Sequence, residues 1–150
     1  MARSGYSRAT PGKGDDPSSV GGGPLPEGVP GPIRVLLVDR DVRVRVAIHQ
    51  TIALESDLTV VAEASDAAEA LAMADRTSPT VALVDLLLPD PATGLDLVRS
   101  LRRRPGCAVV AMTGRGGLRE AALAAGAFAL VDKSGDIDAI LTTVRACAHP

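Results

Sequence analysis

Short runs of branched apolar residues alternate with amphipathic stretches over most of the chain. The first run, 33–38, has the sequence IRVLLV, and similar runs follow at 58–62, 80–84, 107–112 and, more weakly, 128–131. Nearly continuous apolar strands, unlike strands with an alternating pattern, are typical of a parallel sheet covered on both faces. The pattern therefore predicts five buried parallel strands.

Helical patterns lie between and after these runs. Asp41 and Asp66 are suited to cap the first two helices, and Gly126 is a favoured residue for ending the fourth. The predicted helices cover 42–54, 67–76, 94–104, 118–125 and 136–148. This fivefold alternation of strand and helix predicts an α/β domain over 33–150, built on a doubly wound, five-stranded parallel sheet.

The first 32 residues have a different character. They contain 6 of the 11 prolines and 8 of the 15 glycines, including the run 21–23. Such a segment cannot bury enough apolar surface to offset the entropy lost on ordering. We expect residues 1–32 to form a disordered tail.

Composition narrows the function classes. Aromatic residues make up 1% of the chain and its net charge is −2, so it has neither stacking side chains nor an excess of basic ones for nucleic acid. Cys107 and Cys147 form no CxxC motif, which favours a reduced, cytoplasmic setting. No apolar run approaches the ~20 residues that a membrane-spanning helix needs.

Polar residues that could take part in catalysis or ligand binding follow four of the predicted strands. Asp39 and Asp41 follow the first, Asp85 ends the third, Thr113 follows the fourth and Lys133 follows the fifth. In doubly wound folds, ligands bind beyond the carboxyl ends of the strands, where the winding direction changes. We therefore expect these side chains to converge at one edge of the sheet.

Each residue type suits phosphoryl chemistry. Clustered carboxylates attract a hard cation such as Mg²⁺, and a carboxylate can act as a nucleophile that forms an aspartyl phosphate. A lysine can neutralise phosphoryl oxygens and a threonine hydroxyl can bond to one. Taken singly, each has an ordinary explanation: Asp39 and Asp41 as helix caps, Asp85 and Thr113 as strand ends, Lys133 as a solvated loop residue.

The same segments resemble a known family, the receiver domains of bacterial two-component response regulators. VALVDLLLP at 81–89 is similar to the phosphoacceptor segment, with proline four residues after the aspartate. VAMTG at 110–114 is similar to the switch segment, and the AGA at 125–127 stands at the family's spacing from Lys133. The segment 60–70 resembles receivers that usually carry a helix-turn-helix output domain. The resemblance covers 33–148.

This resemblance implies a flavodoxin-like (βα)5 fold and a role in phosphorelay signalling, with no enzyme activity beyond Mg²⁺-dependent self-phosphorylation. A sensor histidine kinase would phosphorylate Asp85 in a Mg²⁺-dependent step. The metal would be held by Asp39, Asp85 and the backbone carbonyl of Leu87, while Thr113 and Lys133 contact the phosphoryl group. The surface of the fourth helix, fifth strand and fifth helix would then bind an output protein that the sequence does not identify.

Arg40 departs from the family pattern. The family usually has two adjacent acids after the first strand, and here Arg40 stands in the second position, which should weaken Mg²⁺ binding. Three arrangements are open. Asp41 substitutes as a ligand, Arg40 turns outward, or Arg40 pairs with Asp85 and holds the domain in one state.

Three smaller features bear on the switch. Leu130 stands where the family often has an aromatic residue, so an aromatic toggle is not expected, and Phe128 comes two residues earlier. The loop 89–94 is one residue longer than the usual pattern. His49 is expected in the first helix without an acid–base partner.

The sequence leaves three functional hypotheses to compare. The first is a stand-alone receiver, since the chain ends near the end of the fifth helix and direct control of transcription is not expected; a homodimer is left open. The second is a phosphorylation-independent pseudo-receiver whose pocket Arg40 alters. The third, a nucleotide-binding enzyme, would need a glycine-rich turn where Asp39, Arg40 and Asp41 stand.

Overall fold

A computed structural model describes residues 31–149, so the predicted tail 1–32 lies almost wholly outside the described residues. The strands are β1 (Ile33–Val38), β2 (Leu58–Ala64), β3 (Val81–Asp85), β4 (Ala108–Thr113) and β5 (Ala129–Asp132). The helices are α2 (Val42–Ala53), α3 (Ala67–Thr77), α4 (Pro91–Arg102), α5 (Arg119–Ala124) and α6 (Ile137–Ala148).

The strands form one five-stranded parallel sheet in the order β2-β1-β3-β4-β5. The chain winds outward from β1 in both directions, so the winding direction changes between β1 and β3. This confirms the predicted doubly wound α/β fold. The last pair in the β1–β3 register is Val38 with Val84, which brings the two residues that follow, Asp39 and Asp85, to the same edge.

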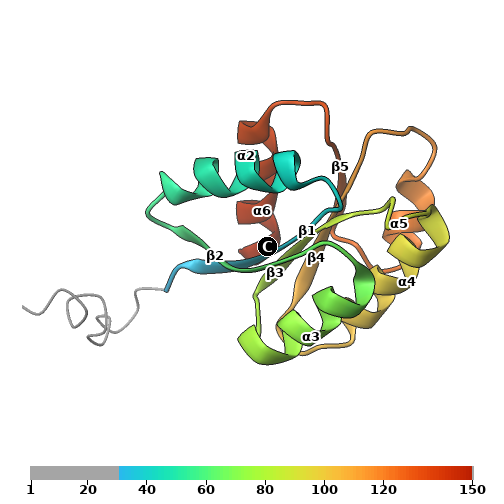
Figure 1. Ribbon diagram of the computed structural model, residues 1–150, viewed down its shortest axis with the longest axis horizontal. Helices are drawn as coiled ribbons and strands as arrows, with labels where there is room; N and C mark the ends of the chain where they lie inside the picture. The colour runs from blue at the N-terminus through green and yellow to red at the C-terminus, as the bar shows by residue number, and fades with distance from the viewer. Residues whose placement is uncertain (1–30, 150) are drawn as a thin grey trace, which may run out of the picture. The chain divides into compact units, whose positions relative to one another are not determined.

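Two helical layers cover the sheet, as Figure 1 shows, with α2 and α6 on one face and α3, α4 and α5 on the other. Successive strand residues enter opposite layers: Leu37 packs with Ile48 and Ile140, whereas Leu36 packs with Leu97 on the opposite face. Both faces are therefore apolar, as the continuous strand pattern predicts.

Aspartates begin four of the helices. Asp41, Asp66, Asp90 and Asp136 each accept a hydrogen bond from a backbone amide in the first turn. Such caps satisfy amides that have no partner within the helix. The caps at Asp41 and Asp66 confirm the two predicted from the sequence.

The predicted start of the third helix at Gly94 is wrong, because α4 begins at Pro91. Asp90 caps the helix through the Thr93 amide at 2.8 Å, and proline in the first turn fits the helical φ without losing a hydrogen bond. The segment 89–94 is therefore a shorter loop followed by helix. The other helices and strands begin and end within about two residues of their predicted positions, an ordinary disagreement at element ends.

None of the helices within residues 31–149 is long and apolar enough to span a membrane. Cys107 and Cys147 are both buried free thiols. Burial raises the pKa of the Cys147 thiol to about 11, which keeps it protonated at neutral pH. Neither cysteine lies at the carboxyl edge of the sheet, so we give them a packing role.

Gly94 is the point at which α4 approaches the chain that leaves β3. A Cβ atom built on Gly94 would lie 2.0 Å from the backbone oxygen of Leu86. Backbone atoms cannot move aside as the end of a flexible side chain can. Only glycine therefore allows α4 to pack this closely beside Asp85.

We predict that Gly94→Ala lowers the free energy of unfolding by about 3 kcal/mol or more, because α4 must shift away from Leu86. Urea denaturation followed by circular dichroism measures the change. Gly116→Ala is the matched control, since a Cβ there meets open space. An unchanged midpoint for Gly94→Ala would contradict the close approach.

Candidate functional site

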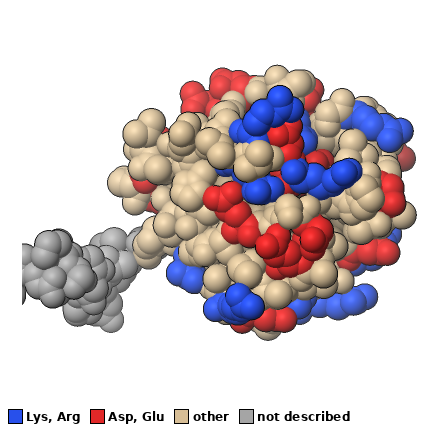
Figure 2. Space-filling model, in the orientation of Figure 1, with Lys and Arg blue, Asp and Glu red and all other residues tan. Residues whose placement is uncertain are grey.

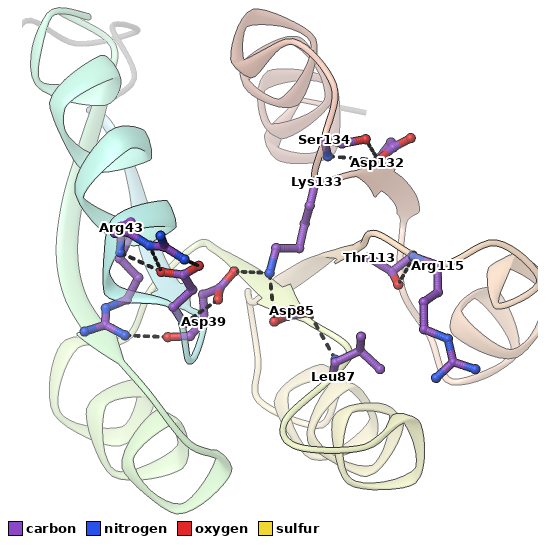
Figure 3. A network of polar contacts seen from close by, with 11 residues as sticks. Asp39, Arg43, Asp85, Leu87, Thr113, Arg115, Asp132, Lys133 and Ser134 are labelled. Atoms are coloured by element: carbon purple, nitrogen blue, oxygen red, sulfur yellow. Dashed lines mark hydrogen bonds and ion pairs between the residues drawn. The ribbon is translucent and has the colours of Figure 1, made fainter.

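One ammonium group joins two buried carboxylates at the carboxyl edge of the sheet. The Nζ atom of Lys133 lies 2.8 Å from Oδ2 of Asp39 and 3.0 Å from Oδ2 of Asp85. Figure 3 shows the lysine reaching down from the loop after β5 to the two aspartates. The structure thus brings together three of the residues that the sequence analysis selected, from three different strand ends.

Asp39 is only 1% exposed. Burial raises the pKa of its carboxyl group, an effect that the ion pair with Lys133 and the hydrogen bond from the Asp41 amide only partly oppose. Its Oδ1 accepts from the Asp41 amide at 2.8 Å, whereas its Oδ2 has the Lys133 ion pair but no contact with full hydrogen-bond geometry. Ionised Asp39 is therefore incompletely compensated in the folded protein.

Lys133 is the cation that this acidic pair needs. Burial alone would lower the pKa of its ammonium group, but the ion pair with Asp39 and the hydrogen-bonded ion pair with Asp85 outweigh burial and raise it above its usual value. The side chain is 20% exposed, so its Nζ lies at the mouth of the site rather than sealed beneath it. Lys133 therefore stays charged and remains within reach of an incoming group.

Asp85 occupies the centre of the group. Its residue is 3% exposed, and its second oxygen, Oδ1, accepts a hydrogen bond from the Leu87 amide at 3.0 Å. The bond from Leu87 and the ion pair with Lys133 fix both carboxylate oxygens. Because Asp85 is the last residue of β3, its backbone is also fixed by pairing with Met112 of β4.

Thr113 lies across Asp85 from Asp39 in Figure 3. It is buried at the end of β4, and its Oγ1 accepts a hydrogen bond from the Arg115 amide at 3.0 Å. Its carbonyl accepts from the Lys133 amide at 3.1 Å. The hydroxyl is therefore held toward its own loop, and its hydrogen is free to be donated elsewhere.

Arg40 points away from this pocket. Its side chain is exposed, and none of the ion pairs within residues 31–149 involves it. The structure therefore contradicts the hypothesis that Arg40 pairs with Asp85: Lys133 already holds that oxygen, and Arg40 is in the outward arrangement. A guanidinium in water also avoids the cost of burying a second cation beside Lys133.

Asp41 is engaged elsewhere. Its carboxylate caps α2 and pairs with the Arg43 guanidinium at 3.1 Å, and these bonds lower the pKa of its carboxyl group. No cluster of three or more His, Cys, Asp or Glu side chains with metal-binding geometry occurs in the described part of the chain. For Asp41 to act as a metal ligand, it would have to leave Arg43.

The oxygen donors beside Lys133 nevertheless suit Mg²⁺. Asp39 and Asp85 supply two carboxylates at one edge, and Mg²⁺ prefers such hard oxygen ligands together with waters. The Asp39 Oδ2 atom, which lacks full hydrogen-bond geometry, has coordinating capacity to spare. The residues fit the metal that the family resemblance implies.

Two residues considered for a switch lie apart from each other. Leu130 is half-buried in a pocket of about 220 Å³ with Arg115 and Arg119, next to Thr113. Phe128 is 46% exposed, lies just before β5, and lines a different pocket with Arg102 and Gly126. Phe128 therefore cannot replace an aromatic side chain at position 130.

The sequence did not predict a second group of polar contacts, which Arg45, Glu63 and His49 form next to the backbone of Asp39. The Arg45 guanidinium donates to the backbone carbonyl of Asp39, and its Nε lies 3.1 Å from Oε1 of Glu63. The expectation that His49 has no partner is wrong, because its Nδ1 lies 2.6 Å from Oε2 of Glu63. No motif marks these contacts, since they join α2 to β2 across 14 to 18 positions of sequence.

A pocket of about 430 Å³ opens beside the site, between α2 and α6. Its lining is mainly apolar, and Asp41, Arg43 and Lys133 stand at its border. On the face drawn in Figure 2, acidic and basic side chains are interspersed, with no broad basic area. The surface there shows no footprint for a nucleic-acid backbone.

Comparison with known proteins gives consistent matches. A family model for the response regulator receiver domain matches residues 35–145. The transcriptional regulatory protein UhpA of Salmonella typhimurium is 34% identical over 116 residues, which is 77% of this chain and 59% of that protein. A protein-glutamate methylesterase/protein-glutamine glutaminase of Rhizobium etli is 37% identical over 110 residues, 69% of this chain and 31% of that protein.

Solved structures of response regulators are also similar to this chain. The receiver domain of the putative response regulator NarL from Mycobacterium tuberculosis superposes with a TM-score of 0.72 at 26% identity, covering 80% of this chain and 98% of that one. A LuxR-family response regulator from Aurantimonas sp. SI85-9A1 gives 0.72 at 31% identity, covering 79% and 86%. The chain spans only about a third to three fifths of the curated relatives named above.

We predict that Asp39→Asn raises the melting temperature at pH 7 by roughly 2–5 °C, because it removes a carboxylate whose ionisation is disfavoured in the fold. A raised pKa costs stability only where the group is ionised. The gain should therefore vanish well below pH 3.8, the ordinary value, and appear as pH rises through the raised pKa.

Differential scanning fluorimetry across pH 3 to 8 measures this effect. Asp75→Asn is the matched control, because Arg104 lowers the pKa of that exposed carboxyl group and its loss should slightly reduce stability at neutral pH. The prediction is contradicted if Asp39→Asn melts at or below the temperature of the unmodified chain at pH 7.

Proposed function

The chain belongs to the response regulator receiver family, and we propose that Asp85 is its phosphoacceptor. The observation that carries this proposal is the ion pairing of Lys133 with both Asp39 and Asp85 at the carboxyl edge of the sheet. Receiver domains are signalling modules of two-component systems. The proposal therefore gives this chain a phosphorylation switch rather than a metabolic reaction.

In the proposed reaction a carboxylate oxygen of Asp85 attacks the phosphorus atom of the donor. An oxygen–phosphorus bond forms, and the bond from phosphorus to the donor's leaving group breaks, so that the leaving group departs with its electron pair. Lys133 is charged and at the mouth of the site, so its Nζ can move from Asp85 Oδ2 to a phosphoryl oxygen. Bound Mg²⁺ would neutralise further phosphoryl charge.

Thr113 then reports the new group. Its hydroxyl oxygen accepts from the Arg115 amide and has a hydrogen to donate. A bond from this hydroxyl to a phosphoryl oxygen would draw the loop 113–117 inward. Because that loop leads into α5, the surface of α5, β5 and α6 would change shape and alter its affinity for an output protein.

We propose that Mg²⁺ is held by Asp39, Asp85 and the carbonyl of Leu87, with low affinity. Arg40 supplies no carboxylate and adds a positive charge near the site, although its exposure to solvent screens that charge. Asp41 would become a fourth protein ligand only after separating from Arg43. Weak binding, rather than a locked pocket, is the consequence of the outward arrangement.

The donor in this proposal is a sensor histidine kinase, and the setting is the cytoplasm. The mainly apolar pocket between α2 and α6 adjoins Lys133, and α2 also exposes Val42 and Val46. These features offer a donor protein apolar contacts next to the phosphoacceptor. Homodimer formation stays a prediction, as does the identity of the output protein.

We predict that incubating the full chain with acetyl phosphate and Mg²⁺ adds the mass of one phosphoryl group, detected by intact-protein mass spectrometry. Asp85→Asn should abolish the addition, since it removes the nucleophile. Asp96→Asn is the control, because Asp96 is exposed on α4 and pairs only with Arg99. Omission of Mg²⁺ should reduce labelling.

A folded, unmodified chain that shows no labelling at saturating Mg²⁺ would overturn this proposal and favour the pseudo-receiver. Labelling of Asp85→Asn would place the phosphoacceptor elsewhere.

We predict that Arg40→Asp raises the affinity for Mg²⁺ by roughly tenfold or more, because it adds a carboxylate and removes a cation at the second-acid position. NMR titration with Mg²⁺ alone, followed at the amides of 39–41 and 87, gives the dissociation constant. Arg76→Asp makes the same charge change on an exposed side chain in the last turn of α3, away from the carboxyl edge of the sheet. Equal effects of both variants would reduce the role of position 40 to general electrostatics.

A further inference from the structure

The backbone carbonyl of Asp39 lies where the sheet stops pairing. The last pair between β1 and β2 is Val38 with Ala64, and the Asp39 amide still donates to the Ala64 carbonyl at 3.1 Å. Beyond that point the segment that follows β2 turns away from β1, and the Ser65 amide donates to Oε1 of Glu69 instead. The Asp39 carbonyl therefore needs a donor from outside the sheet.

Arg45 is that donor. It lies in the first turn of α2, and its Nη1 donates to the Asp39 carbonyl. The side chain is 16% exposed, so the contact is largely shielded from water. A hydrogen bond from a charged donor in such a place is stronger than a neutral one.

Glu63 fixes the orientation of Arg45. Its Oε1 accepts from Arg45 Nε at 3.1 Å, while its Oε2 is 2.6 Å from Nδ1 of His49. The Glu63 side chain is 32% exposed and lies near the end of β2, beside β1. Arg45 is thus held at two points of its planar guanidinium, which is the geometry that arginine supports better than lysine.

We propose that Arg45, oriented by Glu63, is a positioning residue for the Asp39 carboxylate, and this inference rests on the proposed phosphoacceptor site. The Asp41 amide and Lys133 hold the carboxylate end of Asp39. Arg45 holds its backbone end. Together these bonds fix the turn from β1 into α2 with Asp39 directed inward and the next side chain, Arg40, directed to solvent.

An electrostatic role and a positioning role for Arg45 predict opposite changes in Mg²⁺ affinity when Arg45 is replaced. A guanidinium close to a cation site repels the cation, so loss of its charge alone would tighten Mg²⁺ binding. Loss of a group that orients a ligand residue weakens metal binding, often by ten- to a hundredfold. The sign of the change therefore separates a positioning role from a general electrostatic one.

The test compares Arg45→Met and Arg45→Lys in the full chain. Titration with Mg²⁺ alone, followed by NMR, should show roughly tenfold weaker binding for Arg45→Met and an intermediate value for Arg45→Lys, which keeps the charge and one contact. Arg104→Met is the matched control, because Arg104 also bonds one carboxylate, Asp75, and one carbonyl, Ser100, far from the site. It should bind Mg²⁺ as the unmodified chain does.

A second readout needs neither metal nor phosphodonor. Hydrogen exchange of the Asp41 amide, which donates to Asp39 Oδ1, should become about tenfold faster in Arg45→Met while amides of β3 and β4 keep their rates. If Arg45→Met does not fold, Glu63→Gln should give the same changes in weaker form.

Unchanged or tighter Mg²⁺ binding in Arg45→Met, or unchanged exchange at Asp41, would overturn the positioning role. If the unmodified chain binds no Mg²⁺, the assigned metal ligands are wrong, and the exchange measurement alone decides the role of Arg45.

Discussion

The attraction of Lys133 for two buried carboxylates is the interaction on which this site depends. Parallel pairing of β1 with β3 forces Asp39 and Asp85 to the same edge, and two like charges there would repel each other in a poorly hydrated place. An ammonium at 2.8 and 3.0 Å from their oxygens relieves that repulsion without sealing the site. In the proposed reaction the same ammonium then exchanges a carboxylate oxygen for a phosphoryl oxygen.

The rest of the fold serves to hold these charges in place. Its core is built from aliphatic residues on both faces of the sheet, such as Leu36 and Leu37, whose alternation fixes the strand register. Register in turn sets which residues meet at the carboxyl edge. The close approach of Gly94 to Leu86 carries α4 past the chain that leaves Asp85, so the packing and the site are directly connected.

Two arginines on either side of Asp41 have opposite roles. Arg40 stands where the family usually has an acid. Its exposed side chain neither supplies a carboxylate nor fills the pocket. Arg45 lies one turn further along and reaches back to the Asp39 carbonyl. In the proposed site one acid is thus missing, whereas the proposed contacts of Arg45 and Glu63 keep Asp39 in position. We infer a receiver whose metal site is weakened yet still ordered.

The sequence by itself determined the order and nature of the strands and helices, because the apolar runs and the capping aspartates are local signals. It also selected Asp39, Asp85, Thr113 and Lys133, since parallel strands must bring their carboxyl ends to one edge. It missed the start of α4, where the capping bond of Asp90 competes with the helix-breaking tendency that proline and glycine suggest.

Only the tertiary structure decided the direction of Arg40 and the partners of Arg45, Glu63 and His49. A side chain's direction follows from the dihedral angles of its turn and from which neighbour already occupies the pocket, here Lys133. Contacts between a helix and a strand far apart in the sequence leave no periodic signal. They arise because α2 packs on one face of the sheet beside β2, and local sequence cannot specify which side chains meet there.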